Sequence, residues 1–278
     1  MNNTIDRFML HDRVCVITGS AGLLGVQHAY ALLDAGASVV LLDINETALD
    51  KVSRELFLFY GKERILTQPC NIVDKSSILL AKEKTLKQYN KIDVLINNAS
   101  NNPKVENISG GKNWSRFEDF DINTWNFDIQ VGLTGAFLCS QIFGAEMANS
   151  NGGVIINISS DLGIIAPDQR IYMQEGLVDA EQNVKPVTYS IIKHALIGLT
   201  KYLAIYWKDK FVRVNAICPG GIYNGQSDDF VDKLTNLIPM GRMANVDEYK
   251  AAIVFLASDA SSYMTGSSLI IDGGRTCW

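Results

Sequence analysis

The sequence is poor in the residues that build disulfide and metal sites. It holds five cysteines and three histidines in 278 residues, and no two cysteines stand in a C-x-x-C pattern. An odd and scattered set of cysteines argues against a disulfide framework, and so few histidines argue against a zinc site. We therefore expect free thiols and no metal.

Basic charge and long apolar runs are also lacking. The formal net charge is −5, so the chain has no basic surplus that would suit a nucleic acid. No apolar run reaches the ~18 residues that span a bilayer, and residues 1–13 lack the charged-then-apolar order of a signal peptide. These absences predict a cytoplasmic protein whose partner is a small-molecule substrate, with no nucleic acid and no membrane.

The residues that are present describe one ordinary globular domain. Hydrophobic residues make up 47% of the chain, and 278 residues are close to the upper end for a single core. No repeat, low-complexity tract or linker divides the sequence. We expect a single domain over residues 1–278.

A glycine-rich turn between two expected strands is the first motif. An apolar strand at 14–17 leads into Thr18-Gly19-Ser20-Ala21-Gly22-Leu23-Leu24-Gly25, and a helix at 26–35 and a strand at 38–42 complete a βαβ unit. Such glycines allow a tight turn and bring the backbone close to a pyrophosphate at the helix N-terminus. The motif predicts a dinucleotide site, and a turn that binds nothing is the alternative.

Asp43 follows the second strand and indicates which dinucleotide binds. It stands 43 − 25 = 18 positions beyond Gly25, near the ~20 expected for a carboxylate that accepts from ribose hydroxyls. A carboxylate repels the 2′-phosphate of NADP. No positive charge that would offset this repulsion comes from Ser20, Ala21, Ile44 or Asn45. We therefore predict NAD.

The rest of the chain continues the alternation of strands and helices. Further strands are expected at 64–68, 94–96, 154–158, 212–217 and 268–272. Further helices are expected at 47–59, 76–89, 124–148, 187–207 and 246–257. This order predicts an α/β fold, a doubly wound, mostly parallel sheet with helices on both faces, Rossmann-like and single-domain. Ligands bind at the carboxyl ends of such strands, where Asn71, Ile72, Asn98 and Ala99 fall.

Tyr189 and Lys193 form the candidate catalytic pair. Residues four apart lie on one face of a helix, so the ammonium of Lys193 can stand beside the phenol of Tyr189. A neighbouring cation favours the phenolate and lowers the phenol pKa from its usual value near ~10. Tyr189 would then exchange a proton at a carbonyl or alcohol carbon. The same spacing also occurs on many solvated helix faces.

Taken together, the motifs resemble the short-chain dehydrogenase/reductase family. The resemblance covers nearly the whole chain and rests on Thr18-Gly19 through Gly25, Asn97-Asn98-Ala99, Ser160, Tyr189 with Lys193, Pro219-Gly220 and Asp272-Gly273-Gly274. It implies a doubly wound Rossmann-like sheet. It also implies hydride transfer between a nicotinamide and a hydroxyl-bearing or carbonyl carbon of the substrate.

The resemblance implies a role for each matching residue. Ser160 would hydrogen-bond the substrate oxygen, Tyr189 would exchange the proton, and Lys193 would lower the phenol pKa and hold the nicotinamide ribose. The implied cofactor contacts are Gly19 and Leu24 at the pyrophosphate, Asp43 at the adenosine ribose, Asn71 and Ile72 at adenine, Asn98 and Ala99 at the ribose side, and Pro219, Gly220 and Ile222 at the nicotinamide end.

Three features depart from the family pattern. The turn reads T-G-x-x-G-x-x-G, the spacing of the extended branch, which includes sugar-nucleotide epimerases and dehydratases. Gly132 stands where many relatives have an Asn that supports a water chain to the catalytic Lys, so either another group holds the relay or turnover is slowed. The interval from Ser160 to Tyr189 is 189 − 160 = 29 positions, longer than in most relatives, which predicts a substrate-side insertion at about 161–188.

Two polar stretches are candidate substrate contacts. The insertion brings a set that favours a hydroxyl-rich or cationic ligand, unless it is a subunit-contact flap: Tyr172, Gln174, Glu175, Asp179 and Glu181. The stretch 101–123 carries Trp114 and Arg116, an aromatic plate and an anion fork that suit a sugar or a phosphorylated ligand, unless it is a plain surface loop.

The sequence thus predicts an NAD-dependent oxidoreductase acting on a secondary alcohol or ketone of a sugar or sugar derivative. Two alternatives stay open: a sugar epimerase or dehydratase with tightly held NAD, and a non-catalytic NAD-binding protein. A narrower resemblance is to the dehydrogenases of flagellin-glycan and nonulosonic acid synthesis. Because the family usually associates through its long helices, we expect a homodimer or homotetramer formed by 124–148 and 187–207.

Overall fold

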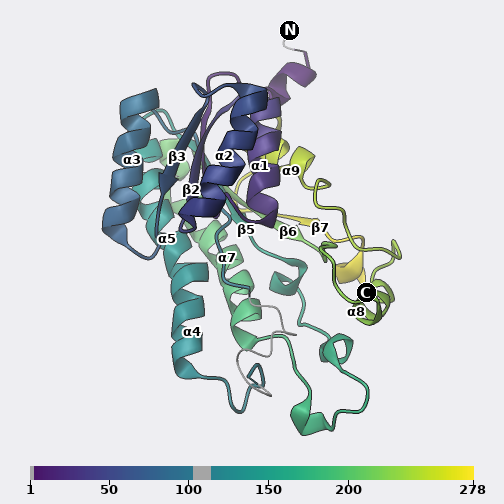
Figure 1. Ribbon diagram of the computed structural model, residues 1–278. Helices are drawn as coiled ribbons and strands as arrows, with labels where there is room; N and C mark the ends of the chain where they lie inside the picture. The colour runs from purple at the N-terminus through teal and green to yellow at the C-terminus, as the bar shows by residue number, and fades with distance from the viewer. Residues whose placement is uncertain (1–2, 103–113) are drawn as a thin grey trace.

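A parallel β-sheet lies at the centre of the computed structural model, which describes residues 3–102 and 114–278 (Figure 1). The seven strands found in these residues run in the order β3-β2-β1-β4-β5-β6-β7. Their bounds are β1 Val14–Thr18, β2 Ser38–Asp43, β3 Ile65–Pro69, β4 Val94–Asn97, β5 Gly153–Ile158, β6 Val212–Pro219 and β7 Ser268–Ile271. The order reverses at β1, which pairs with both β2 and β4. This confirms the doubly wound α/β fold and places a crevice beyond the ends of β1 and β4.

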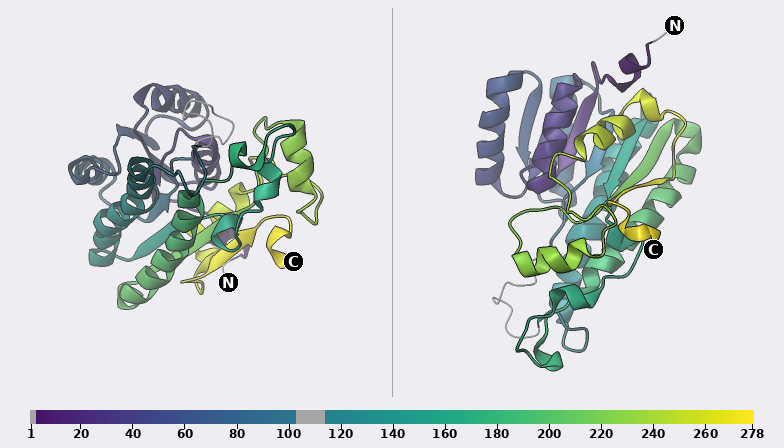
Figure 2. Two further views of the ribbon diagram at one scale, coloured as in Figure 1. Left: turned by 90° about the horizontal axis from the view of Figure 1, so that it is seen from below. Right: turned by 90° about the vertical axis from the view of Figure 1, so that its right-hand side faces the viewer.

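Helices cover both faces of the sheet, as Figures 1 and 2 show. One face carries α1 Leu23–Asp34, α2 Glu46–Tyr60 and α9 Lys250–Ala257, and the other carries α3 Lys75–Tyr89, a long helix formed by Ile122–Asn149, and α7 Val187–Tyr206. Leu32 of α1 and Ile253 of α9 belong to one apolar core, and Phe143 of the long helix belongs to the other. Burial of both sheet faces explains why the strands read as continuous apolar runs.

Side-chain caps fix where several helices begin. The Asn45 side chain accepts a hydrogen bond from the Ala48 N–H at 3.0 Å, and Asp74 accepts from the Ser76 N–H at 2.9 Å. Ser227 caps α8 Asp228–Thr235 in the same way. Such caps satisfy backbone donors that the first helical turn leaves unpaired. Helix α8 was not predicted from the sequence. The other α-helices lie within a few residues of their predicted ends, except that α9 begins at Lys250 rather than 246.

The long helix is interrupted by two π-helical turns. Its parts are α4 Ile122–Ile129, η3 Gln130–Thr134, α5 Gly135–Cys139, η4 Ser140–Gly144 and α6 Ala145–Asn149, with η3 and η4 the π-helical turns. Gly132 lies in η3, where an added Cβ would stand 2.8 Å from Ile192 Cγ2 of α7. Packing of the two helices therefore explains the glycine at the position where relatives have Asn.

The same helix is long and apolar enough to cross a membrane. Among the described residues it is the one stretch that passes this test, and 56% of its most apolar window is buried inside the protein. The expectation that no such run exists was therefore wrong. Its burial against α7 and the sheet is typical of a core helix, which passes the same test.

The expected insertion at about 161–188 forms an ordered cap beside α8 (Figure 2). It contains three short 3-10 turns, η5 Asp161–Gly163, η6 Gln169–Tyr172 and η7 Asp179–Glu181. The Gln182 amide donates to the carbonyls of Gln174 and Leu177, both at 2.9 Å. Ile171 packs with Leu234 in a small apolar core. These contacts fold the cap on itself and pack it against α8.

Candidate active site

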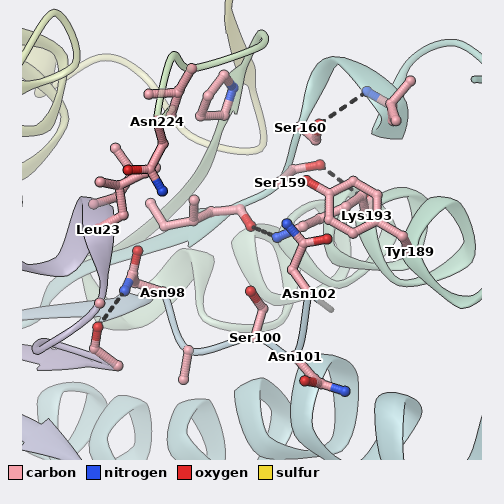
Figure 3. Close-up of a pocket in the computed structure, with 18 of the residues that line it drawn as sticks. Leu23, Asn98, Ser100, Asn101, Asn102, Ser159, Ser160, Tyr189, Lys193 and Asn224 are labelled. Carbon is pink, nitrogen blue, oxygen red and sulfur yellow. Dashed lines mark hydrogen bonds between the residues drawn. The ribbon is translucent and has the colours of Figure 1, made fainter. Parts of the chain in front are cut away.

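One cavity of about 780 Å³ opens at the carboxyl ends of the central strands (Figure 3). All thirteen predicted site residues line it: Gly19, Leu24, Asp43, Asn71, Ile72, Asn98, Ala99, Ser160, Tyr189, Lys193, Pro219, Gly220 and Ile222. Polar lining residues that sequence reasoning did not assign include Asn101, Asn102, Asp161, Lys185, Asn224, Gln226 and Arg275. The structure brings the predicted set together, and the role of each member stays a prediction.

The glycine turn is shaped by close approach of backbone atoms. Gly19 has a φ of 61°, and an added Cβ there would stand 2.7 Å from Ala99 Cα. An added Cβ at Gly25 would stand 2.2 Å from the Gly19 carbonyl oxygen. Gly22 caps α1 without any side-chain bond, and Gly22, Leu23 and Leu24 at the start of the helix line the cavity. This arrangement is suited to an anion such as a pyrophosphate.

Asp43 is held at the rim of the glycine turn. Its Oδ2 accepts from the Ala21 N–H at 3.0 Å, and its Oδ1 accepts from the Asn45 N–H at 2.9 Å. The carboxylate is thereby fixed facing the cavity, at the end of β2. Together with the uncapped helix start, this donor and acceptor set fits a nicotinamide dinucleotide.

Asn98 fastens the end of β4 to the glycine turn (Figure 3). Its amide donates to the carbonyls of Thr18 at 3.0 Å and Gly19 at 2.9 Å. The Thr18 hydroxyl in turn accepts from the backbone N–H groups of Asn98 and Ala99. Asn98 thus holds the turn in place, in addition to lining the cavity as predicted.

Ser160, Tyr189 and Lys193 meet at the opposite end of the cavity (Figure 3). The Lys193 ammonium lies 5.5 Å from the centroid of the Tyr189 ring and donates to the Ile158 carbonyl at 2.8 Å. The Ser159 hydroxyl donates to the Lys193 carbonyl at 2.7 Å, which ties β5 to α7. The predicted helical spacing therefore does place phenol and ammonium side by side.

Burial governs the pKa values of this pair. Burial raises the pKa of Tyr189 to about 12, against a smaller lowering by the hydrogen bond with Ser160. Burial, and then the nearby Lys185, lowers the pKa of Lys193 to about 8. The expectation that Lys193 pulls the phenol pKa below its usual value was therefore wrong for this structure. The cost of burying a phenolate outweighs the stabilisation that its hydrogen bond with Ser160 provides.

A buried ion pair between Asp161 and Arg275 lies behind Ser160, and it was not predicted from the sequence. The Ser160 hydroxyl donates to Asp161 Oδ1 at 2.7 Å, and Arg275 Nη1 donates to Asp161 Oδ2 at 2.7 Å. The side chains of Arg275 and Asp161 are only 6% and 4% exposed. In this arrangement the Ser160 hydroxyl faces Asp161, and its oxygen also accepts from the Leu162 N–H at 3.2 Å. No sequence spacing links position 275 to position 161.

Lys185 is a second lysine beside Tyr189. Its ammonium lies 4.0 Å from the centroid of the Tyr189 ring and donates to Asn102 Oδ1 at 2.9 Å. Burial lowers its pKa to about 8. Helical spacing gave no signal for it, because α7 begins after Pro186 and Lys185 lies outside the helix.

The two polar stretches differ from expectation. Of the five residues proposed from the insertion only Tyr172 lines the cavity, so the four others do not form a ligand contact there. Arg116 donates to the Asp179 carbonyl at 2.6 Å and pairs with Glu118 at 3.5 Å, so it is engaged away from the cavity. Residues 103–113 of the expected rim lie outside the described residues.

Comparison with known proteins agrees with this geometry. A sequence family described as "Enoyl-(Acyl carrier protein) reductase" matches residues 19–276. D-threitol dehydrogenase of Mycolicibacterium smegmatis is 30% identical over 274 residues, covering 97% of this chain and 95% of that protein. NAD-dependent glycerol dehydrogenase of Listeria innocua is 34% identical over 277 residues, covering 97% and 96%. NADP-dependent mannitol dehydrogenase of Hypocrea jecorina is 32% identical over 283 residues, covering 99% and 96%.

Solved structures share the whole fold. A short-chain type dehydrogenase/reductase from Mycobacterium marinum is 28% identical with a TM-score of 0.84, and each chain covers 100% of the other. A gluconate 5-dehydrogenase from Burkholderia cenocepacia, in complex with NADP and tartrate, is 26% identical with a TM-score of 0.84. The match covers 99% of this chain and 100% of that one. These similarities extend over the cavity described above.

Proposed function

The chain belongs to the short-chain dehydrogenase/reductase family, and from this premise we propose that it is an NAD-dependent dehydrogenase of a secondary alcohol in a polyol or sugar derivative. The observation that carries the proposal is one continuous cavity with Asp43 and the uncapped start of α1 at one end and Ser160, Tyr189 and Lys193 at the other. The relatives named for threitol, glycerol and mannitol support an alcohol substrate.

The chain's own residues define how an alcohol is activated. Ser160, whose hydroxyl donates to Asp161 in this structure, turns that hydroxyl to donate to the substrate oxygen, which leaves the substrate's own proton for Tyr189. Tyr189 exchanges the proton with the substrate oxygen, as general base in oxidation and general acid in reduction. Lys193, anchored on the Ile158 carbonyl, stabilises the phenolate that forms during the exchange. The bound nicotinamide supplies the hydride acceptor or donor.

NAD is proposed over NADP on electrostatic grounds. Asp43 is the charged residue that lines the cavity at the glycine turn, and the cavity-lining cations Lys185, Lys193 and Arg275 belong to the catalytic end. A 2′-phosphate at the adenosine ribose would meet a carboxylate, and the cavity lining within residues 3–102 and 114–278 offers no positive charge beside it. One relative is named for NAD and another for NADP, so the proposal of NAD for this chain rests on Asp43.

The test is absorbance of the reduced nicotinamide with NAD and then NADP, over a panel of alditols, aldonates, sugar phosphates and simple secondary alcohols. We expect NADH to form with one polyol class and NAD to be preferred. Formation of NADPH at an equal or higher rate would contradict the cofactor assignment. Bound NAD without net NADH formation across the panel would favour the epimerase or the non-catalytic binding protein.

We further propose a cytoplasmic homodimer or homotetramer formed through the long helices. The outer face of α7 exposes Tyr202, Ile205 and Tyr206 by 64% or more, and Phe137 is exposed on the neighbouring long helix. Exposed apolar groups gathered in this way mark association surfaces. Light scattering after size-exclusion chromatography should give two or four copies, and Tyr206→Glu should lower that number. A monomeric wild-type protein would contradict the proposal.

A further inference from the structure

The catalytic end of the cavity holds an excess of positive charge. Four charged side chains line it, and two of them, Asp161 and Arg275, are paired with one another. The other two are the ammonium groups of Lys185 and Lys193, and neither makes an ion pair with any residue in the described ranges 3–102 and 114–278. A ligand in this end of the cavity therefore meets uncompensated positive charge.

Lys193 has a place in the chemistry, and Lys185 does not. Lys193 is occupied by the Ile158 carbonyl beneath Tyr189. Lys185 reaches the same ring at 4.0 Å and has neutral partners, the ring itself and the Asn102 amide oxygen. An ammonium carries three N–H donors, so one bond to Asn102 leaves two donors for a ligand. A half-buried ammonium with neutral partners gains when an anionic ligand compensates its charge.

The position of Lys185 is fixed on both sides. Its backbone N–H donates to Gln169 Oε1 at 2.8 Å, which anchors it to the cap segment. Pro186 follows and restricts the chain at the start of α7. The ammonium is held on the other side by Asn102 at 2.9 Å. Lys185 is thus preorganised at the wall of the cavity, beside the ring whose hydroxyl exchanges the proton.

We propose that Lys185 is an anion-binding residue of the substrate pocket, and that the substrate carries a carboxylate or phosphate group within a few carbons of the alcohol that is oxidised. This proposal rests on the proposed dehydrogenase function and names its substrate class. A cationic ligand is disfavoured, because Asp161, the acidic residue of the insertion that lines the cavity, is already paired with Arg275. A neutral polyol satisfies hydrogen bonds there but leaves the ammonium charge uncompensated.

The experiment compares substrates that differ in one group. The set is ribitol, ribonate and ribitol 5-phosphate, with the C4 and C6 analogues of each, and kcat/KM is measured with NAD for every member. We expect an anionic member to exceed the alditol of the same skeleton by about 10-fold or more, the usual worth of a charge-assisted hydrogen bond. Ribonate against ribitol 5-phosphate shows whether the anion is a carboxylate or a phosphate.

The matched variants are Lys185→Met, Lys185→Arg and Lys201→Met. Lys185→Met removes the charge and should lower the anionic-to-neutral ratio of kcat/KM by about 10- to 100-fold. Lys185→Arg keeps the charge and should retain more of the ratio. Lys201 is exposed on the same helix, so Lys201→Met should leave the ratio unchanged. A neutral alditol that equals both anionic members, or a Lys185→Met ratio equal to that of Lys201→Met, overturns the proposal.

Calorimetry distinguishes failure of the proposed dehydrogenase function from failure of the anion site. If no member is oxidised, the same compounds are titrated into the NAD-loaded protein and into NAD-loaded Lys185→Met. Binding of an anionic member at least about 10-fold tighter than its alditol, lost in Lys185→Met, supports the anion site although the proposed reaction has failed. Equal binding of neutral and anionic members, or no binding of either, overturns the anion site as well.

Discussion

The two ends of the cavity are built in different ways. The cofactor end is formed by backbone: a glycine turn, an uncapped helix start and Asp43, which two backbone N–H groups hold in place. The catalytic end is formed by side chains from separate parts of the chain, among them Ser160, Lys185 and Arg275. The ends also differ in charge, a carboxylate at one and ammonium groups at the other. The first end suits a shared cofactor, and the second end is where one family member can differ from another.

The largest effect at the catalytic end is expected from Tyr189→Phe. Removal of the hydroxyl takes away the proton-exchanging group, so kcat should fall by about 10²- to 10⁴-fold. Affinity for NAD should change little, because the cofactor end is untouched. Steady-state kinetics and NAD titration measure the two effects, with Tyr202→Phe on the exposed face of α7 as control. Near-normal turnover in Tyr189→Phe would remove Tyr189 from the reaction.

The buried pair behind Ser160 should dominate stability at the catalytic end. Arg275→Met leaves the Asp161 carboxylate buried without its partner and should lower the free energy of unfolding by about 3–5 kcal/mol. The double variant Asp161→Asn with Arg275→Met removes both charges and should recover much of this loss. Urea unfolding measures all three proteins. If Arg275→Met is as stable as the wild type, the ion pair contributes nothing to the free energy of unfolding.

A smaller effect is expected from Gly132, where the long helix packs against α7. Gly132→Asn forces a side chain against Ile192 and should lower the free energy of unfolding by about 1–3 kcal/mol. Ile192→Ala in the same protein should offset part of that cost by making room. Gly198→Ala on α7 is the control, since its added Cβ meets nothing within 4 Å. Gly132→Asn at wild-type stability, with restored turnover, would show that packing does not explain the glycine.

The preference for anionic over neutral substrates should depend on pH through Lys185 at the catalytic end. The pKa of Lys185 is lowered to about 8, so the ammonium is charged below that pH and neutral above it. The groups whose charges act on it are Lys193 on α7 and Asp161 on η5. The anionic-to-neutral ratio of kcat/KM should therefore fall as pH rises through about 8. A ratio that stays flat from pH 6.5 to 9.5 would contradict anion binding by Lys185.

The cofactor end was predictable from sequence because its determinants are local. The glycine turn and Asp43 lie within one βαβ unit, so spacing alone places them. The same holds for Tyr189 and Lys193 of the catalytic end, which lie one helical turn apart. The parallel sheet follows from the alternation of apolar strands and helices. These features need no knowledge of contacts between distant segments.

The catalytic end was predicted only in part because its determinants are not local. Asp161 and Arg275 are 114 positions apart and meet only in the folded protein. Lys185 lies before Pro186, outside the helical spacing that links Tyr189 to Lys193. The raised pKa of Tyr189 comes from burial, which spacing does not reveal. The π-helical turns and the contact of Gly132 with Ile192 likewise depend on packing between helices.

The most direct test of the central claim is a side-by-side assay of the wild type, Asp43→Asn and Tyr189→Phe. NAD and NADP affinities and NADH formation are measured for each protein with the best alcohol of the panel. We predict that Asp43→Asn weakens the preference for NAD over NADP while the substrate KM is kept. Tyr189→Phe should keep the cofactor affinities and lose turnover. If Tyr189→Phe oxidises the alcohol at close to the wild-type rate, or if Asp43→Asn leaves cofactor preference unchanged, the account of this cavity is contradicted.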